Sequence, residues 1–311
     1  MKIGFIGSSA ISRFHIDALK NNNFEIEAIG TRFLSSNCKK FAESLNLLDK
    51  FCDGGWEEVL KKDVDAFCLC INTKETPKIL REILKVGKSV FVEKPVSLYF
   101  EDFDYFINHP MKDNIFVGYN RRFYKTINIA KKRCENSPQG GTIVVNIPDS
   151  NSGKKQFLNN GCHMIDSLRY IVGDFEVCNS ILRMETNGLD FSSISALCKT
   201  KNWSILINAH SKISSNFSIT INIDDMVYEL KPLEKLNVYQ GIKISEPTFD
   251  EPIRRYNPML KESIIESSIF KPGFNEMYKN FSEYIYNKNS NFCNISDARE
   301  TIKTCLDLIK E

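Results

Sequence analysis

His163 is the residue of this 311-residue chain best suited to acid–base chemistry. It is one of four histidines and stands in the stretch Gly161–Asp166, where an amphipathic pattern predicts a helix from about Cys162. Histidine changes charge near neutral pH, and the positive end of a helix favours its neutral, basic form. We interpret His163 as a candidate general base, with a capping or packing histidine as the alternative.

Lys94 is a second candidate, placed after a predicted strand. The strand covers Ser89–Val92 and is followed by Glu93, Lys94 and Pro95. In a parallel sheet ligands bind beyond the carboxyl ends of the strands, so this lysine could hold an oxygen of cofactor or substrate. Its charge would also favour loss of a proton from a neighbouring hydroxyl. A surface lysine before a proline is the alternative.

The turn after the first predicted strand, Gly7–Ser12, suggests a site for the phosphates of a dinucleotide. The dinucleotide fingerprint has three glycines, for a tight turn, close approach to the pyrophosphate and close helix packing. Only Gly7 is present here, and Ser9 and Ser12 occupy the other two places. Both are small, and the helix N-terminus still offers N–H groups to a phosphate. An ordinary strand–turn–helix is the alternative.

The end of the second predicted strand bears on the choice of cofactor. NAD sites usually place an acid here for the ribose 2′-hydroxyl, whereas an arginine suits the 2′-phosphate of NADP. This sequence has Thr31 and Arg32 and no acid at that place. The pattern slightly favours NADP over NAD, and a surface arginine is the alternative.

An alternation of strand and helix patterns over residues 1–118 predicts the frame that positions these groups. It is typical of an α/β fold with a doubly wound, parallel sheet. The predicted strands are Lys2–Ile6, Glu25–Ile29, Asp65–Ile71, Ser89–Val92 and Ile115–Val117, and the helices are Ile11–Leu19, Cys38–Leu45 and Pro77–Val86.

The pattern changes near Gly118–Arg122, and residues 119–311 predict an α+β domain with one open, mostly antiparallel sheet. Alternating apolar positions such as Ile194, Ile205 and Ile207 suggest a sheet face for self-association. The predicted helices are Phe123–Arg133, Cys162–Val172, Phe274–Tyr286 and Ala298–Lys310, and the strands are Thr142–Ile147, Ser180–Glu185, Ile194–Cys198, Trp203–Ala209, Phe217–Ile223 and Met226–Leu230.

Composition narrows the class of protein. A net charge of +2 without a dominant basic patch argues against a nucleic-acid partner. No apolar run approaches the length of a membrane span, and the first residues lack the pattern of a signal peptide. Ten cysteines without a Cys-x-x-Cys pair indicate buried thiols in a reducing compartment. We expect a cytoplasmic protein with no metal site and no membrane partner.

Four stretches together resemble the Gfo/Idh/MocA oxidoreductases, the family of glucose–fructose oxidoreductase and inositol dehydrogenase. They are Arg13–His15 near the start of the first helix, Gly87–Pro95 with its Glu-Lys-Pro block, Gly118–Phe123, and the Gly-x-His-x-x-Asp site of Gly161–Asp166. The resemblance spans nearly the whole chain, and these stretches occur in the family's order.

The resemblance implies a Rossmann domain over 1–118 and a substrate-binding and oligomerisation domain over 119–311, in a homodimer or homotetramer. It implies that Lys94 and His163 face the nicotinamide of NAD or NADP. His163 would exchange the hydroxyl proton while hydride moves between a substrate carbon and the nicotinamide, and Lys94 would orient the oxygen. Substrates of the family are often sugars, inositols or nucleotide sugars.

The resemblance also assigns further residues to the site. Substrate contacts are expected from Asn159, Asp166 and Tyr119. The expected cofactor contacts are Gly7, Ser8, Ser9, Ala10, Ile11, Thr31, Arg32, Asn72, Glu93, Lys94, Asn120 and Arg122.

The chain departs from the family pattern at some positions. Asn159 stands where the family often has Asp, so it can bind substrate but cannot accept a proton. Ile71 and Asn72 replace a Thr-Pro pair, and Thr76 replaces a histidine. Two alternatives to an enzyme therefore remain, a dinucleotide-binding sensor or partner protein with altered catalysis, and a scaffold with a relic pocket. Lys94 together with His163 favours an enzyme.

Overall fold

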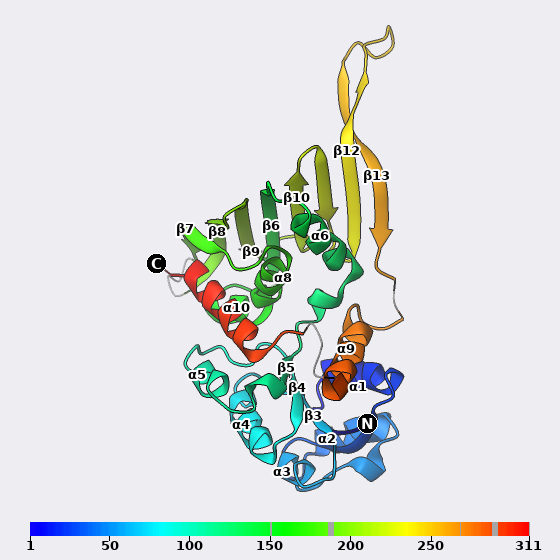
Figure 1. The fold of residues 1–311 in the computed structure, drawn as a ribbon, viewed down its shortest axis with the longest axis vertical. Coiled ribbons are helices and arrows are strands. Elements are labelled where there is room, and N and C mark those ends of the chain that lie inside the picture. The colour runs from blue at the N-terminus through cyan, green and yellow to red at the C-terminus, as the bar shows by residue number, and fades with distance from the viewer. Residues whose placement is uncertain (150, 186–189, 268, 288–291, 311) are drawn as a thin grey trace. The chain divides into compact units, whose positions relative to one another are not determined.

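The computed structural model describes residues 1–149, 151–185, 190–267, 269–287 and 292–310. The chain divides into two compact units (Figure 1). The first unit joins Met1–Phe123 to Ser268–Lys303, and the second joins Tyr124–Ser267 to Thr304–Glu311. The predicted division had placed every residue after 118 in the second domain, whereas the fold returns a later segment to the first unit. The roles predicted for the two domains stay predictions.

The first unit is built on a five-stranded parallel sheet in the order β2-β1-β3-β4-β5. Most residues in these strands are buried, because helices cover both faces, as the near-continuous apolar runs predicted. The predicted parallel, doubly wound sheet is confirmed. The strands are β1 (Lys2–Ile6), β2 (Glu25–Gly30), β3 (Ala66–Leu69), β4 (Ser89–Val92) and β5 (Ile115–Val117).

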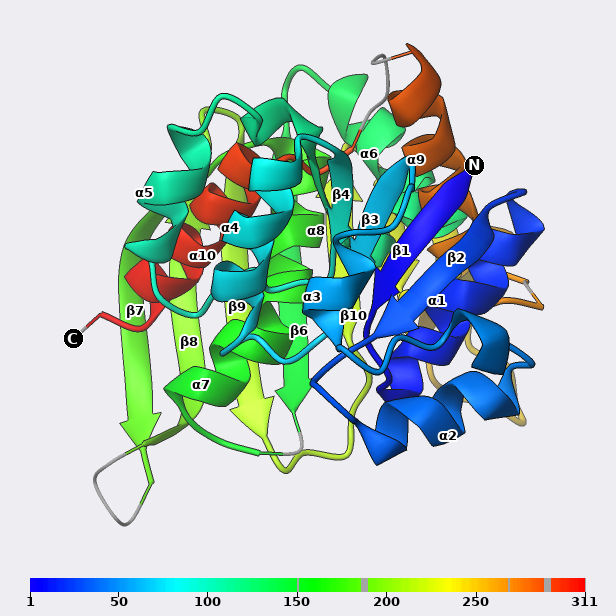
Figure 2. The same ribbon diagram turned by 90° about the horizontal axis from the view of Figure 1, so that it is seen from below.

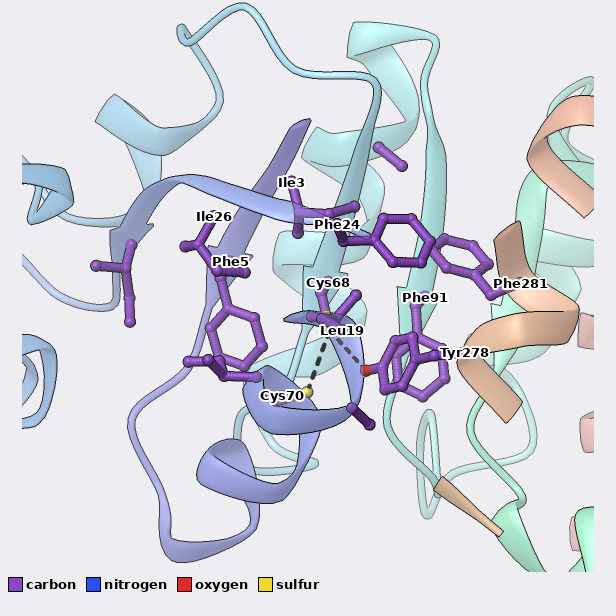
Figure 3. Packing of buried hydrophobic residues seen from close by; sticks show 14 of the residues in the cluster. Ile3, Phe5, Leu19, Phe24, Ile26, Cys68, Cys70, Phe91, Tyr278 and Phe281 are labelled. Atoms are coloured by element: carbon purple, nitrogen blue, oxygen red, sulfur yellow. Dashed lines mark hydrogen bonds between the residues drawn. The ribbon is translucent and has the colours of Figure 1, made fainter. Parts of the chain in front are cut away.

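The helices of the first unit come from both ends of the chain. α9, from the returning segment, packs beside α1 and adds Tyr278 and Phe281 to a core that also contains Phe5 and Phe91 (Figure 3). The predicted second domain had contained this helix. The helices are α1 (Ala10–Asn21), α2 (Ser36–Ser44), α3 (Trp56–Val59), α4 (Thr76–Val86), α5 (Asp102–Ile107) and α9 (Phe274–Asn287), and α10 (Ile295–Leu308) carries residues of both units.

The second unit contains an eight-stranded sheet in the order β13-β12-β11-β10-β6-β9-β8-β7. Among the strand pairs that the structure describes in this sheet, β6 and β9 alone run parallel, so the predicted mostly antiparallel sheet is confirmed. β12 and β13 were not predicted. The strands are β6 (Gly141–Asp149), β7 (Glu176–Met184), β8 (Phe191–Lys199), β9 (Trp203–Ser211), β10 (Ser218–Ile223), β11 (Met226–Leu230), β12 (Lys235–Ser245) and β13 (Arg255–Ile265).

One face of this second sheet is covered by α6 (Lys125–Glu135) and α8 (Cys162–Val172) (Figures 1 and 2). Ile194, Ile205 and Ile207 are buried, whereas the alternate positions Leu197 and Leu206 are 52% and 41% exposed. The prediction that the three isoleucines form an open face for self-association was therefore wrong. The alternation of apolar and polar residues along a strand shows which residues share a face, but it does not show which face the helices cover.

β12 and β13 form a hairpin that extends beyond the rest of the sheet (Figure 1). We call the segment Ile242–Ile265 the arm. Nearly every residue of β13 is exposed. The arm carries large apolar side chains on its surface, namely Ile242, Ile244, Phe249, Ile253, Tyr256, Met259, Leu260 and Ile265. Among the helices that the structure describes, none is long and apolar enough to cross a membrane.

Candidate active site

A cleft of about 600 Å³ lies at the carboxyl ends of β1, β2 and β3 in the first unit. In the strand order 2-1-3-4-5 the connections leave β1 in opposite directions, and ligands bind at such a switch point. The size is that of a small-molecule or cofactor pocket. The lining residues are Ile6, Ser8, Ser9, Thr31, Arg32, Ser35, Asn37, Trp56, Cys70, Ile71, Asn72, Glu75 and Ile79.

Gly7 forms the turn that opens this cleft. Its N–H donates to the carbonyl oxygen of Gly30 at 3.2 Å, which ties the end of β1 to the end of β2. A Cβ atom at Gly7 would lie 2.5 Å from the carbonyl oxygen of Cys70. Because backbone at that distance must shift, only glycine fits this place, which is why this fingerprint glycine is present.

The two serines that replace the other glycines hold the start of α1. The N–H of Ser9 donates to Oγ of Ser12 at 3.1 Å, and the N–H of Ser12 donates to the carbonyl oxygen of Ser9 at 2.9 Å. Ser12 is fully buried, so a small side chain fills the place of the third glycine. Ala10 and Ile11 follow as the first residues of α1, whose amide groups open the helix toward a phosphate.

The end of β2 meets the start of α3. The N–H of Trp56 donates to the carbonyl oxygen of Thr31 at 2.8 Å, and Trp56 is half-buried in the cleft wall. Arg32 lines the same wall with an exposed side chain. Sequence reasoning did not place Trp56 in the site, because it follows the strand by a long loop. Ser35, which also lines the cleft, is the N-cap of α2, where its Oγ accepts from the N–H of Cys38 at 3.3 Å.

Asn72 shapes the third wall of the cleft, after β3. Its Oδ1 accepts from the N–H groups of Lys74 and Glu75, both at 3.1 Å. These bonds fix the side chain at the approach to α4. The amide nitrogen of Asn72 is then the group that could donate to a ligand.

The cysteines beside the cleft are held as neutral thiols. Burial raises the pKa of the Cys70 thiol well above its usual value, and hydrogen bonding to Cys68 adds to the increase. Burial also raises the pKa of Cys38, although its hydrogen bonds to Thr31 and Ser8 act in the opposite direction. Because the thiolate is the nucleophilic form, neither cysteine is a candidate for covalent catalysis.

Glu93 and Lys94 follow β4 and are both half-buried. Oε1 of Glu93 accepts from Nε2 of His15 at 2.9 Å, so this predicted cofactor ligand turns one carboxylate oxygen toward the protein interior. Lys94 stands directly after it at the carboxyl edge of the sheet. Neither residue lines the cleft described above.

Tyr119, Asn120 and Arg122 follow β5 and are buried. Nδ2 of Asn120 donates to the carbonyl oxygen of Pro272 at 3.0 Å, and Nη1 of Arg122 donates to Oδ2 of Asp297 at 3.3 Å. The two side chains thus bind the later segment, Ser268–Lys303, to the part of the first unit formed by Met1–Phe123. Their predicted contacts with cofactor, and that of Tyr119 with substrate, stay predictions.

In the second unit, His163 is the second residue of α8, which continues a longer helical run. Helical residues begin at Lys154 with α7 (Lys154–Gln156), continue through a π-helical turn over Phe157–Gly161, and run on into α8. The predicted helix over Cys162–Val172 is confirmed as α8, and the expected effect of its positive end on His163 stays a prediction. π-helical turns occur frequently at functional sites.

Asn159, His163 and Asp166 share this one helix. Asn159 lies in the π-helical turn, where a Cβ at Gly161 would meet the ring of Phe157 at 2.6 Å, so the motif glycine lets the turn close. His163 is half-buried, and its carbonyl oxygen accepts from Oγ of Ser167 at 2.7 Å. Asp166 is fully buried one turn later. Asn159, His163 and Asp166 therefore lie on one helical run of the second unit, whereas Lys94 and Tyr119 belong to the first unit.

The parallel sheet, the glycine turn after β1 and the cleft at the switch point define a dinucleotide-binding Rossmann unit. Residues 1–120 match the model of a family described as "Oxidoreductase family, NAD-binding Rossmann fold", the Gfo/Idh/MocA family. The match covers 120 of the 311 residues and includes the five strands of the Rossmann sheet.

Two relatives and one solved structure show how far the similarity extends along the chain. Over 186 residues the chain is 28% identical to myo-inositol 2-dehydrogenase of Thermotoga maritima, which is 56% of this chain and 55% of that protein. The match therefore spans about half the length of that relative. An inositol 2-dehydrogenase/D-chiro-inositol 3-dehydrogenase of Lacticaseibacillus casei is 21% identical over 297 residues, covering 88% and 86% of the two chains. A crystal structure of a dehydrogenase from Clostridium difficile has the same fold, with a TM-score of 0.79, 19% identity and coverage of 99% and 98%.

Proposed function

We propose that the protein is an NAD(P)-dependent dehydrogenase or reductase acting on a CH–OH group of a sugar, an inositol or a nucleotide sugar. The observation that carries the proposal is the cleft at the switch point, lined from the ends of three adjacent parallel strands. The inositol dehydrogenases among the relatives support a polyhydroxylated substrate.

His163 is the group that we assign to proton transfer. When bound, the nicotinamide accepts or donates hydride at one ring carbon. An alcohol releases hydride readily only when its O–H proton leaves, so a base is required. Histidine is the side chain that changes charge near neutral pH, so His163 suits proton transfer, whereas the ammonium group of Lys94 is better suited to orient the oxygen and stabilise negative charge on it.

We further propose that NADP is bound at least as well as NAD. Arg32 lines the cleft with an exposed guanidinium, at the place where an acid would repel a 2′-phosphate. A charge-assisted hydrogen bond from guanidinium to phosphate would then add affinity for NADP.

Self-association belongs to the same proposal, now with the arm as its surface. Monomeric proteins rarely leave so many large apolar side chains exposed together. The arm has four basic and four acidic residues, and Arg254 pairs with Glu246 and Arg255 with Glu251, so it has no net charge to attract nucleic acid or anionic lipid. A second copy would present the same neutral, apolar surface.

Light scattering on the full chain tests self-association. We expect a dimer or tetramer at micromolar concentration, and a lower mass after Leu260→Lys in the arm. A monomeric wild type would refute this part of the proposal.

The cysteines support a location in the reducing cytoplasm. All ten are free thiols, and nine of them are buried.

The main experiment follows cofactor binding before activity. The chain has two tryptophans, and Trp56 lines the cleft, so NAD and NADP should quench its fluorescence. A Trp203→Phe variant keeps that signal and removes the other tryptophan. Hydride transfer over a panel of sugars and inositols, followed by absorbance of the reduced nicotinamide, then separates an enzyme from the alternative, a dinucleotide-binding sensor. If neither NAD nor NADP quenches the fluorescence, both the enzyme and the dinucleotide-binding sensor are rejected.

A further inference from the structure

A buried histidine in the first unit bonds to the residue before Lys94. His15 lies on α1 with no exposed surface, and its Nε2 is 2.9 Å from Oε1 of Glu93. Its other nitrogen, Nδ1, is 2.7 Å from the hydroxyl of Tyr278 on α9. Both ring nitrogens are therefore used, one toward the end of β4 and one toward the returning segment.

The hydrogen bonds continue from Tyr278 to the cleft. Its hydroxyl is 3.2 Å from Sγ of Cys68, which is 3.6 Å from Sγ of Cys70 (Figure 3). Cys70 lines the cleft after β3. One connected series of polar groups thus joins the cleft wall to Glu93 through the interior, and its members come from α1, β3, β4 and α9.

Aromatic rings fix the orientation of the imidazole. The ring of His15 lies 5.3 Å from that of Phe91 and 4.7 Å from that of Phe274, measured between centroids. With packing on its faces and a partner at each nitrogen, the ring has one orientation. The titratable groups that these contacts place around it are Glu93, Tyr278, Cys68 and Cys70.

We propose that His15 is a positioning residue for the reaction proposed above, on which this inference rests. By donating to Oε1 of Glu93 it holds that carboxylate against the core, and so fixes the strand end from which Lys94 extends. Tyr278 acts with it by holding Nδ1. Glu93 then serves the site as an internal anchor for Lys94 and not mainly as a ligand of the cofactor.

Two substitutions test the hydrogen bonds of the two ring nitrogens of His15 separately. The amide nitrogen of glutamine in His15→Gln occupies about the place of Nε2 and can still donate to Glu93. The shorter side chain of His15→Asn places its amide near Nδ1, so it contacts Tyr278 and loses Glu93. Both variants lose the same aromatic packing, so their stabilities should fall by similar amounts.

Hydrogen exchange of the peptide Val92–Val96 is the first readout, because it needs neither cofactor nor substrate. We expect exchange there to be roughly tenfold faster in His15→Asn than in His15→Gln, at matched global stability. With cofactor and a substrate, kcat should fall by roughly 10–100-fold in His15→Asn and stay near the wild-type value in His15→Gln, since small misplacements of a catalytic group are costly.

A hydroxyl deletion in α9 provides a milder test with a matched control. Tyr278→Phe should speed exchange at Val92–Val96 by a smaller factor. Tyr284→Phe, in the same helix and also buried, removes a hydroxyl bonded to Asn114 and should leave that peptide unchanged. Equal exchange and equal kcat in His15→Asn and His15→Gln would overturn the inference. Absence of cofactor binding by the wild type would instead reject the proposed function, whatever the exchange shows.

Discussion

The strand ends of the first unit and the helix of the second unit carry their candidate groups in different ways. At the strand ends each residue is set by a short turn after a buried strand, as Gly7, Arg32 and Asn72 are. On the helix, His163 lies well inside a helical run that begins at Lys154. The first region suits binding of an extended ligand by several turns, and the second suits placement of a few side chains at fixed spacing. Substitutions at the strand ends should then change cofactor affinity, and those on the helix should change turnover.

The largest expected effect is on the helix. His163→Asn removes the group to which we assign the hydroxyl proton, and we expect turnover to fall by roughly 10²–10⁴-fold with little change in cofactor affinity. Steady-state kinetics, with circular dichroism as a check of folding, measures this. Lys94→Met should lower turnover and also weaken binding. Near-normal turnover in His163→Asn would move the acid–base role to Tyr119 or a water molecule. The helix would then no longer be the region whose substitutions change turnover.

Arg32→Ala sharpens the comparison at the strand ends. We expect it to weaken NADP more than NAD, by about 1.5–3 kcal/mol, because a charge-assisted hydrogen bond to the 2′-phosphate is lost. Fluorescence titration with both cofactors measures the difference. Arg13→Ala, which removes an exposed guanidinium from α1, is the matched control and should affect neither cofactor. Equal losses for NAD and NADP would show that Arg32 does not read the phosphate.

Gly7→Ala tests the turn itself. The added Cβ would press on the carbonyl oxygen of Cys70, so we expect a loss of about 1–3 kcal/mol in the free energy of unfolding together with weaker cofactor binding. Gly87→Ala is the control. Its Cβ meets nothing within 4 Å, and only its φ of +79° opposes the change. Urea unfolding and cofactor titration should show that the control loses about 1–2 kcal/mol and no affinity. Unchanged affinity in Gly7→Ala would separate the turn from the site.

The smallest expected effect is the pH dependence of buried thiols in the second unit. Burial raises the pKa of Cys134 and of Cys198 to about 12. The unfolded thiols lose their protons near pH 9 while the folded ones keep them, so the protein should lose stability from about pH 9 toward pH 12. Melting temperatures across this range measure the loss, and Cys198→Val should make the slope shallower. An unchanged slope in that variant would show that other groups control alkaline unfolding.

The sequence predicted best what short stretches determine. The strands of the first sheet were found because short apolar stretches mark them, although Glu25 and Glu27 interrupt the second, and the turn at Gly7 was found because it follows the first strand. The helix start at Lys154 was missed because a loop-like composition, rich in Ser, Asn, Gly and Lys, precedes it. β13 was missed because both of its faces are exposed, which removes the alternation that marks a half-buried strand, and β12 alternates only in its first half. Trp56 was missed because it follows the second strand by a long loop, and only the tertiary fold brings it to the cleft.

The same limit applies to contacts between distant segments. No local pattern shows that His15 meets Tyr278, 263 positions later. Nor does alternation alone reveal that Ile205 faces helices while Leu206 faces outward. In both cases the partner is chosen by tertiary packing.

The return of α9 to the first unit sets the order in which this protein can be completed. During synthesis the five strands of the Rossmann sheet leave the ribosome early, but Tyr278 and Phe281 follow only after the whole second sheet has been made. Until they arrive, the nascent sheet lacks part of the cover over Phe91, and His15 lacks its hydroxyl partner. The Rossmann sheet, which is synthesised first, thus reaches its final packing last, when α9 covers it.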